Sequence, residues 1–295
     1  MSFTFTGTGV ALVTPFTMDG AVDYDSLTGI INNIKNGGAD YLVALGTTAE
    51  TSALDGDEKK KVLAHVLKVA GNSIPVVLGI GGNNTLSVIN EIKQTDFSSI
   101  AALLSVTPYY NRPSQEGLYN HYIKIAETSP VPVILYNVPS RTGVNMEAST
   151  SLRLATHPNI SAIKEASGNI TQAMEILRSA PSGFNLISGD DGISLPLMSM
   201  GASGVISVAA NAIPSAVSAL INACLAQDFV TARKFSNRLF PLFRSLFLEG
   251  NPVGIKAALS VLGFSSPVVR MPLQQASDGL ISLIESDIKE LNKTI

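Results

Sequence analysis

Residues 132–136 read Pro-Val-Ile-Leu-Tyr, and residues 41–45 read Tyr-Leu-Val-Ala-Leu. Neither run alternates apolar with polar side chains, which is the pattern of a strand covered on both faces. Strands of that kind belong to parallel sheets, in which each strand is followed by a crossover helix. The two runs therefore favour a β/α repeat.

Eight apolar runs of this kind occur along the chain. Segments with helical periodicity lie between them, most clearly over residues 57–70, 85–94, 116–127 and 171–180. Eight strand-then-helix units predict an α/β protein with a closed (β/α)8 TIM barrel, a fold that takes about 250 residues. The strands are predicted to begin near Gly9, Tyr41, Pro75, Ala101, Pro132, Ile160, Asn185 and Gly204.

The pattern changes after residue 226, where no further strand-like run precedes a helix. Amphipathic periodicity predicts helices over residues 228–247, 251–262 and 272–291. We therefore predict a catalytic barrel domain over residues 1–226 and a C-terminal helical domain over residues 227–295. For this helical appendage we expect a role in packing or oligomerisation.

The composition excludes several classes of protein. A net charge of −3 and a pI near 5.6 disfavour binding to nucleic acid. Cys224 is the only cysteine, so neither an intrachain disulfide nor a cysteine-based metal site is expected, and a reducing cytoplasm fits. Pro15 interrupts the first apolar run, and no window reaches the 18 apolar residues of a membrane span, so we expect neither export nor membrane insertion.

The segments that follow the predicted strands are unusually polar. In a TIM barrel the working residues lie at the C-terminal ends of the strands and in the loops that follow. We therefore expect these segments to surround one mouth. They cover residues 46–50, 79–84, 107–113, 136–142, 164–166, 188–191 and 204–207.

Lys164 differs from the other lysines because it closes an apolar run, residues 159–163, and is predicted at the rim of the barrel interior. Burial there penalises the ammonium form and favours a neutral amine, which can attack a carbonyl to form a Schiff base. The alternative is a structural lysine held by Glu165 or another carboxylate.

A Schiff-base enzyme also needs a proton shuttle. Tyr136 and Tyr110 lie at the ends of the fifth and fourth strands, and a tyrosine relays protons when its hydroxyl is bonded to another, such as that of Thr47. Without Lys164 both tyrosines are better interpreted as packing residues. Arg141 is a candidate clamp for a substrate carboxylate, with an ordinary surface ion pair as the alternative.

Other motifs are weaker. Gly79-Ile-Gly-Gly82 is only a fragment of a dinucleotide fingerprint, so a flexible turn is favoured. Asp190 and Asp191 are candidates for a divalent cation, but no further histidine or carboxylate accompanies them at strand ends. The adjacent Gly189 is a candidate substrate-binding position. No metal or organic cofactor is expected.

Six motifs together resemble the dihydrodipicolinate synthase family, within the wider group of pyruvate-dependent aldolases. The resemblance runs from residues 10–16 to residues 251–259. It implies a lyase of lysine and diaminopimelate biosynthesis that condenses pyruvate with L-aspartate 4-semialdehyde. The motifs are GTTAE (46–50), VTPYYNRPSQEGLY (106–119), ILYNVPSRTG (134–143), IKEASGN (163–169), SGDD (188–191) and GVISV (204–208).

The resemblance also implies roles for single residues. Lys164 matches the imine-forming lysine, Tyr136 the proton-transferring tyrosine, and Thr47 and Tyr110 its relay partners, with Tyr110 reaching across a subunit interface. Three further positions match substrate contacts: Thr48 and Ile206 for pyruvate, and Arg141 for the semialdehyde carboxylate. The family is commonly a homotetramer built from two dimers.

Two alternatives stay open. N-acetylneuraminate lyases share the barrel and the lysine, but they carry Gly-Ser-Thr-Gly-Glu at residues 46–50 and lack an arginine at position 141. A catalytically silent barrel that binds an oxo acid is the second alternative. One departure from the family is Ala49, which replaces a glycine, so we expect a local change in this turn if the residue needs a positive φ.

The lysine-feedback site of bacterial members is altered in this sequence. Asn83 and Tyr109 match the family, but Ser87 stands where a glutamate is expected, and Gly56 and Lys59 occupy the loop that carries histidines. The loss of an acceptor and the gain of a cation weaken any site for an ammonium group. We therefore predict weak or absent inhibition by lysine.

Overall fold

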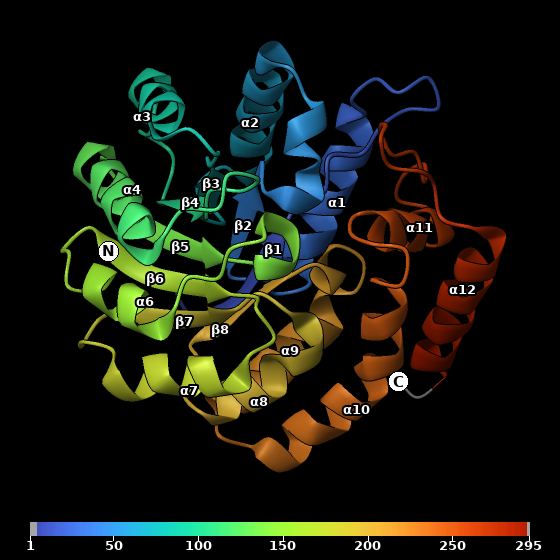
Figure 1. The fold of residues 1–295 in the computed structure, drawn as a ribbon. Helices are drawn as coiled ribbons and strands as arrows, with labels where there is room; N and C mark the ends of the chain where they lie inside the picture. Colours follow the sequence, from blue (N-terminus) through green and yellow to red (C-terminus); the bar gives the residue numbers. More distant parts are fainter. Residues whose placement is uncertain (1–4, 294–295) are drawn as a thin grey trace.

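The computed structural model describes residues 5–293 and contains one closed barrel of eight parallel strands. The strands follow one another around the barrel in chain order, and β8 pairs back with β1 (Figure 1). The predicted TIM barrel is confirmed, and every strand begins close to its expected residue. The bounds are β1 Gly7–Ala11, β2 Tyr41–Ala44, β3 Val76–Gly79, β4 Ala102–Val106, β5 Val133–Asn137, β6 Ile160–Glu165, β7 Asn185–Ser188 and β8 Gly204–Ser207.

Helices surround the strands, and several begin at a residue whose side chain caps them. The Asp55 side chain accepts hydrogen bonds from the N–H groups of residues 57 and 58, and the Asp55 N–H donates to the Glu58 carboxylate, which forms a capping box. The helices of the barrel are α1 Tyr24–Asn36, α2 Gly56–Ala70, α3 Thr85–Gln94, α4 Gln115–Thr128, α5 Pro139–Thr142, α6 Ala148–Leu154, α7 Ile170–Ser179, α8 Ser194–Ser199 and α9 Pro214–Leu225. Four short 3-10 turns lie in the segments after β2, β7 and β8: η1 Thr47–Ala49, η2 Thr51–Ala53, η3 Asp191–Ile193 and η4 Ala209–Asn211.

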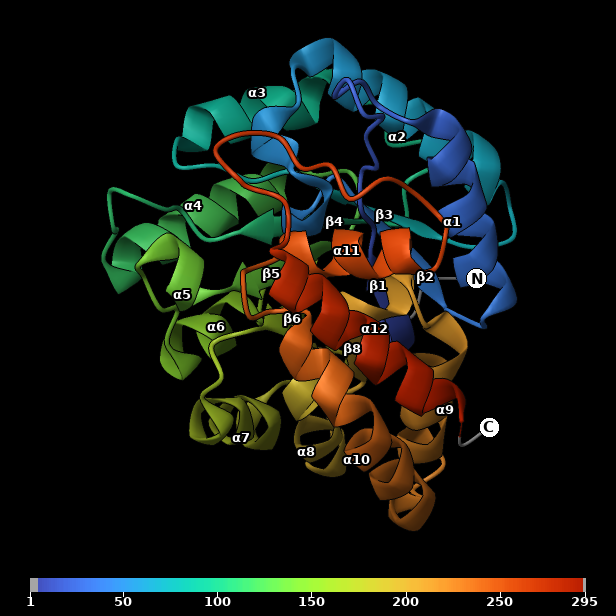
Figure 2. The ribbon, with the colours of Figure 1, turned by 90° about the vertical axis from the view of Figure 1, so that its right-hand side faces the viewer.

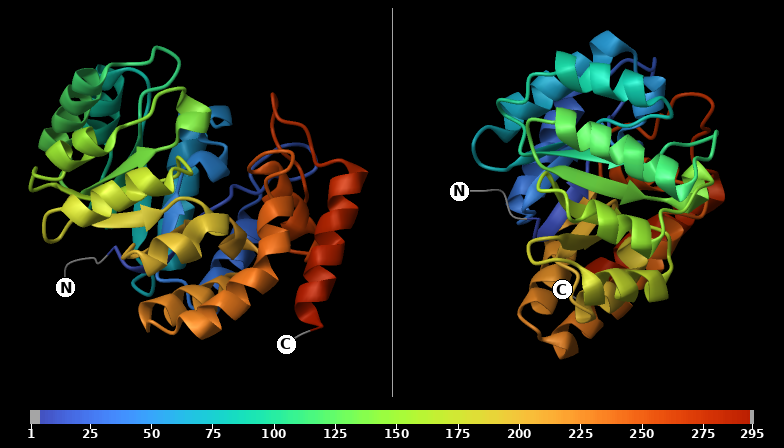
Figure 3. Two further views of the ribbon diagram at one scale, coloured as in Figure 1. Left: turned by 60° about the horizontal axis from the view of Figure 1, so that its bottom comes forward. Right: turned by 60° about the vertical axis from the view of Figure 1, so that its left-hand side comes forward.

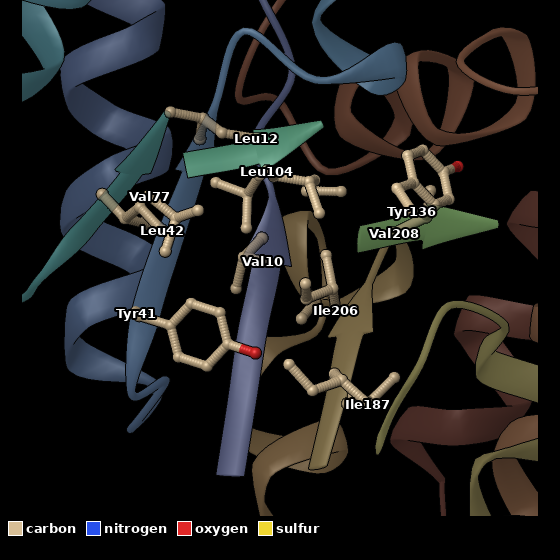
Figure 4. Packing of buried hydrophobic residues seen from close by; sticks show 14 of the residues in the cluster. Val10, Leu12, Tyr41, Leu42, Val77, Leu104, Tyr136, Ile187, Ile206 and Val208 are labelled. Atoms are coloured by element: carbon tan, nitrogen blue, oxygen red, sulfur yellow. The ribbon is translucent and has the colours of Figure 1, made fainter. Parts of the chain in front are cut away.

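The core fills the barrel and the layer beneath the helices. Side chains from different strands meet in the interior, among them Val10 of β1, Leu104 of β4 and Ile206 of β8 (Figure 4). The strands are buried on both faces because the helices cover the outside, which explains their lack of alternation. The polar ends of the strands are left at the rim.

Three helices complete the chain and cover one side of the barrel (Figures 1 and 3). They are α10 Phe229–Ser245, α11 Val253–Val261 and α12 Asp278–Asn292. Helix α10 packs along α9, and α12 packs against both α10 and α11 (Figure 2). The predicted helical appendage is confirmed, whereas its boundary at residue 226 stays a prediction.

The start of the last helix was predicted wrongly. It begins at Asp278 and not at Pro272, because Ser277 supplies the capping oxygen, which accepts the N–H of Leu280. Apolar spacing extends further towards the N-terminus than the helix does, and the cap decides the boundary. Within residues 5–293, no helix has the length and apolar character that are needed to cross a bilayer.

Candidate active site

The turn after β2 has a strained backbone. Leu45 and Glu50 bracket this turn, and both have left-handed φ angles, of 54° and 53°. Such a conformation costs about 1–3 kcal/mol for a residue with a side chain and persists where the surroundings impose it. A Cβ at Gly79 would lie 2.5 Å from the Leu45 carbonyl oxygen. Gly79, the last residue of β3, therefore permits close backbone approach to this turn, and the flexible turn favoured for residues 79–82 stays a prediction.

Ala49 lies within the 3-10 turn η1 and is not among the left-handed residues. Its side chain is buried, and its N–H donates to the carbonyl of Gly46. The expected change at this position does not occur, because the turn places its strain on Leu45 and Glu50. Alanine is accommodated at position 49 without cost to the backbone.

A cavity of about 350 Å³ opens beside this turn. Thr47, Tyr136 and Arg141 all line it, although they come from different loops and strands. Lys59 of α2 and Glu91 of α3 contribute to its wall as well. A hydroxyl, a phenol and a guanidinium therefore share one space, which suits a substrate that carries a carboxylate.

Lys164 lies on β6 next to Tyr136 on β5. The two residues are paired across the parallel strands, and the Lys164 Nζ lies 4.3 Å from the centroid of the tyrosine ring. Lys164 is only 6% exposed. Among residues 5–293, no carboxylate forms an ion pair with it. The predicted nucleophile is thus buried, without an anionic partner, beside a residue that lines the cavity.

Glu165 is bound elsewhere, which contradicts the alternative of a lysine held by its neighbour. Its carboxylate accepts hydrogen bonds from Asn137 Nδ2 at 3.1 Å, Gln172 Nε2 at 3.1 Å and the Ser167 N–H at 2.6 Å. These three donors satisfy a carboxylate that is 2% exposed. Successive side chains of a strand point to opposite faces, so Glu165 is directed away from Lys164.

Gly189 makes room for the lysine. A Cβ at this position would lie 3.1 Å from Lys164 Cε and 2.6 Å from the Ala166 Cβ. Its N–H donates to the Glu165 carbonyl at 2.8 Å. The structure thus gives Gly189 a steric contact with Lys164, and its predicted contact with substrate stays a prediction.

Thr48 and Arg141 are both tied to Asn251, which lies between α10 and α11. Asn251 Nδ2 donates to Thr48 Oγ1 at 3.0 Å, and Arg141 Nη2 donates to the Asn251 carbonyl at 3.3 Å. An amide NH₂ only donates, so the Thr48 hydroxyl is the acceptor in this bond and keeps its own proton for another partner. Sequence reasoning did not single out Asn251, whose only signal was its place in the NPVGIKAAL motif.

Within this chain, Tyr110 lies apart from the other candidate active-site residues. It is 85% exposed, has a φ of 74° and does not line the cavity. Ile206 lies on β8 opposite Gly9, is 1% exposed, and its side chain belongs to the barrel core (Figure 4). The side chain of Ile206 is therefore packed in the core, and the predicted contact of this residue with pyruvate stays a prediction.

Asp190 and Asp191 cap the backbone. Asp191 Oδ2 accepts the N–H groups of Val208 and Ala209, each at 3.0 Å, and Asp190 Oδ1 accepts that of Gly192 at 2.8 Å. Burial raises the pKa of Asp191, against the effect of these donors. The two carboxylates therefore hold the backbone of the loops after β7 and β8.

A second buried lysine, Lys256 of α11, was not recognised in the sequence. It is fully buried and forms an ion pair with Glu50 at the end of the strained turn. Its Nζ also donates to the Val268 carbonyl at 2.9 Å and lies 3.8 Å from the centroid of the Phe16 ring. Burial lowers the pKa of Lys256 to about 8, although Glu50 opposes the shift.

A sequence profile of the Dihydrodipicolinate synthetase family matches residues 4–291. The chain belongs to this family. The match covers the barrel as well as the three C-terminal helices, so both parts of the fold are features of the Dihydrodipicolinate synthetase family. The resemblance drawn from the six motifs is confirmed.

Members of the Dihydrodipicolinate synthetase family align with nearly the whole length of the chain. The 4-hydroxy-tetrahydrodipicolinate synthase of Parabacteroides distasonis is 50% identical over 268 residues, 90% of each chain. The chloride-inhibited synthase of Acinetobacter baumannii, solved with pyruvate, has a TM-score of 0.95 at 38% identity and covers 98% of this chain and 99% of its own. A monomeric synthase variant has a TM-score of 0.95 at 36% identity, with 98% and 97% covered. The predicted lyase-type synthase function is confirmed at the level of the family.

Proposed function

We propose that the chain condenses pyruvate with L-aspartate 4-semialdehyde through an imine on Lys164, giving 4-hydroxy-tetrahydrodipicolinate. The observation that carries the proposal is a buried Lys164 without a carboxylate partner, 4.3 Å from the ring centroid of Tyr136. Tyr136 lines the same cavity as Arg141, so a proton donor and a carboxylate receptor share one space, and the nucleophile lies beside the donor. The family relationship supports the same substrates.

The first half of the reaction forms the imine. The neutral amine of Lys164 adds to the C2 carbonyl of pyruvate, and the carbinolamine loses water to leave a protonated imine. The positive nitrogen then withdraws electrons, so that a methyl proton leaves and an enamine forms. Tyr136 is the adjacent acid and base for these transfers, and Thr47 lines the same cavity as its relay partner.

In the second half, the enamine carbon attacks the aldehyde of the semialdehyde. The new alkoxide takes a proton, and the amine of the second substrate then adds to the imine carbon and displaces Lys164. This transimination closes the ring and frees the enzyme. Arg141 lines the cavity wall and is assigned to the carboxylate of the semialdehyde, because a guanidinium matches a carboxylate in a bidentate pair.

The carboxylate of pyruvate is assigned to the turn after β2. Thr48 is buried, and its hydroxyl already accepts the Asn251 amide, so its free proton is available to a carboxylate oxygen. The main chain near Ile206 is the second contact, and Gly189 leaves space for the reacting lysine. No step in this scheme requires a metal or an organic cofactor.

Tyr110 is proposed to act in a neighbouring subunit. A tyrosine that is 85% exposed and held at a left-handed φ of 74° has little reason to be so placed in an isolated chain. Contact with a second copy buries its ring and brings its hydroxyl towards the partner's relay. We propose a homotetramer made of two such dimers. Sedimentation of the wild type and of a Tyr110→Phe variant tests this, and an active wild-type monomer contradicts it.

Trapping with borohydride tests the proposed function. Reduction in the presence of pyruvate is expected to add one pyruvate-derived group to the Lys164 peptide in a mass spectrum. Turnover of pyruvate with aspartate semialdehyde, measured beside N-acetylneuraminate as an alternative substrate, identifies the acceptor. An absent adduct favours the silent barrel, and turnover of the sugar acid alone favours the lyase.

A further inference from the structure

The buried Lys256–Glu50 pair joins the C-terminal helices to the turn that carries Thr47 and Thr48. Lys256 and Glu50 are both almost inaccessible to solvent, with side-chain exposures of 0% and 2%. The second oxygen of Glu50 accepts the N–H of Arg270 at 2.8 Å. Both oxygens of this carboxylate are therefore held by groups from the last fifty residues of the chain.

Glu50 is also the last residue of the turn, and its own backbone is strained. Its left-handed φ of 53° is unusual for a residue with a side chain and must be imposed by contacts. The backbone of Glu50 donates to the Thr47 carbonyl at 3.1 Å and accepts the N–H of Ala53 at 2.8 Å, and both partners lie in the adjoining 3-10 turns. The contacts of Glu50 with distant parts of the chain are therefore those of its side chain, with Lys256 and with the Arg270 N–H.

Stability alone does not explain a charged pair at this place. Two desolvated charges rarely stabilise a fold more than a well-packed apolar pair of the same volume. The ion pair instead fixes geometry, because a carboxylate that is held from two sides can occupy only one position. Any shift of that carboxylate moves the backbone of Glu50, two residues from Thr48.

We propose that Lys256 and Glu50 are positioning residues that hold the turn over residues 45–50, so that Thr47 lines the cavity and the Thr48 hydroxyl is presented to the substrate. The pair then controls the binding of a 2-oxo acid without touching it. The inference deepens the proposed function and depends on it, since Thr48 is there the contact for the carboxylate of pyruvate.

Asn251 gives independent support from the same segment. It lies five positions before Lys256, donates to Thr48 Oγ1 at 3.0 Å and accepts from Arg141 at 3.3 Å. The stretch over residues 251–256 thus holds the turn at two points, the hydroxyl of Thr48 and the carboxylate of Glu50. A rigid attachment at two points fixes both the place and the orientation of the turn.

Three variants separate positioning from simple anchoring of the helices. Lys256→Met leaves Glu50 charged and unpaired in the interior, Glu50→Gln is a milder change that keeps an acceptor, and the double variant removes both charges. Each is compared with the wild type in melting temperature and in the pyruvate concentration that half-saturates borohydride trapping at Lys164. Trapping reports on imine formation and needs no second substrate.

Arg238→Met is the matched control. Arg238 of α10 donates to the Leu291 carbonyl of α12, so its loss loosens the C-terminal helices and touches neither the turn nor the cavity. We expect this variant to melt earlier than the wild type and to half-saturate within about twofold of the wild-type pyruvate concentration. If Lys256 and Glu50 only linked the helices to the barrel, loosening the helices through Arg238→Met would shift both the melting temperature and the half-saturating pyruvate concentration.

The expected result is a split between stability and binding. Lys256→Met raises the half-saturating pyruvate concentration by about tenfold or more and lowers the melting temperature. In the double variant the melting temperature recovers, because the unpaired charge is gone, but pyruvate binding does not. Should Lys256→Met fail to fold, Glu50→Gln is expected to weaken trapping by about threefold to tenfold.

Two results overturn the inference. One is a double variant in which binding recovers together with the melting temperature, and the other is an Arg238→Met variant that weakens trapping as much as Lys256→Met does. Failure of the proposed function looks different, since wild-type protein then forms no adduct at Lys164 at any pyruvate concentration.

Discussion

Two lysines of this molecule are buried, and their surroundings differ in one decisive respect. Lys164 lies over the ring of Tyr136 and has no ion pair within residues 5–293. Lys256 lies over the ring of Phe16 and is paired with Glu50. Both amines thus share burial and an aromatic face, and only one has an anion.

The comparison teaches which buried lysine is suited to covalent chemistry. Bonding of Lys164 to a substrate carbon breaks no ion pair. The same reaction at Lys256 would leave the buried carboxylate of Glu50 uncompensated, which costs several kcal/mol. The cavity adds a second difference, because Tyr136, the aromatic neighbour of Lys164, lines it, whereas Phe16, the aromatic neighbour of Lys256, does not. Burial of an amine is therefore a poor sign of reactivity unless its partners are known.

The largest expected effect comes from removing the unpaired amine. Lys164→Ala is expected to abolish the borohydride adduct and to lower kcat by about 10⁴-fold or more, because the whole covalent route is lost. Lys256→Met, which is also a loss of a buried lysine, is expected to keep the adduct at saturating pyruvate. An adduct on Lys256 in the wild type, found by peptide mass spectrometry, would reverse the comparison.

The second effect concerns the ring beneath each lysine. Tyr136→Phe gives Lys164 the same kind of neighbour that Lys256 has in Phe16, and it is expected to lower kcat by about 10²–10³-fold through loss of the proton shuttle. Tyr122→Phe is the matched control, since Tyr122 donates to the Ser105 carbonyl at 2.9 Å outside the cavity lining. It is expected to cost about 1 kcal/mol of unfolding free energy and little activity. Equal kcat values for the two variants would remove Tyr136 from the mechanism.

The third effect is a pH dependence of the paired lysine. With a folded pKa of about 8, Lys256 loses its charge as the pH rises towards 9, so the ion pair with Glu50 becomes a weaker hydrogen bond from a neutral amine. The charges that face it are those of Glu50 and Arg270, the latter paired with Glu58. If only protein with a protonated Lys256 binds pyruvate, the pyruvate concentration that half-saturates trapping is about tenfold higher at pH 9 than at neutral pH. Trapping by Lys256→Met is expected to lack this rise.

Stability moves in the opposite direction over the same range. An unfolded lysine keeps its proton up to about 10.5, the ordinary pKa, so between pH 8 and 10.5 the unfolded chain binds more protons at residue 256 than the folded chain does. The contribution of Lys256 to the unfolding free energy therefore increases with pH in this window. Denaturant titrations of wild type and Lys256→Met at pH 7.5 and 9.5 isolate the difference, and a decrease for the wild type relative to the variant contradicts the assignment.

The smallest expected effect is that of free lysine. Lys59 is a third lysine near the site, half-buried in the cavity wall, and its cation opposes a bound ammonium even though Glu91 contributes to the same wall. Half-inhibition is expected at about 1 mM lysine or above. Lys59→Ala is expected to lower that concentration in a steady-state assay. Half-inhibition of the wild type at a lysine concentration well below millimolar would show that another acceptor for the ammonium group outweighs the charge of Lys59.

Much of this protein could be predicted from local sequence. Eight apolar runs without alternation fixed the barrel, and the position of Lys164 at the end of the sixth run placed it at the mouth, because strand periodicity decides which residues lie at strand ends. The family followed from six motifs. The start of the last helix could not be predicted equally well, since the cap at Ser277 competes with apolar spacing.

The contacts between distant segments were decided only by the tertiary structure. Asn251 meets Thr48 across 203 residues of chain, and Lys256 meets Glu50 across a similar span. Periodicity describes how one segment folds, but it carries no information about which charged residue of a distant helix docks against a given turn. The sequence by itself determined a barrel with an amine at its mouth, whereas the packing of the C-terminal helices decided which of the two buried amines has a partner.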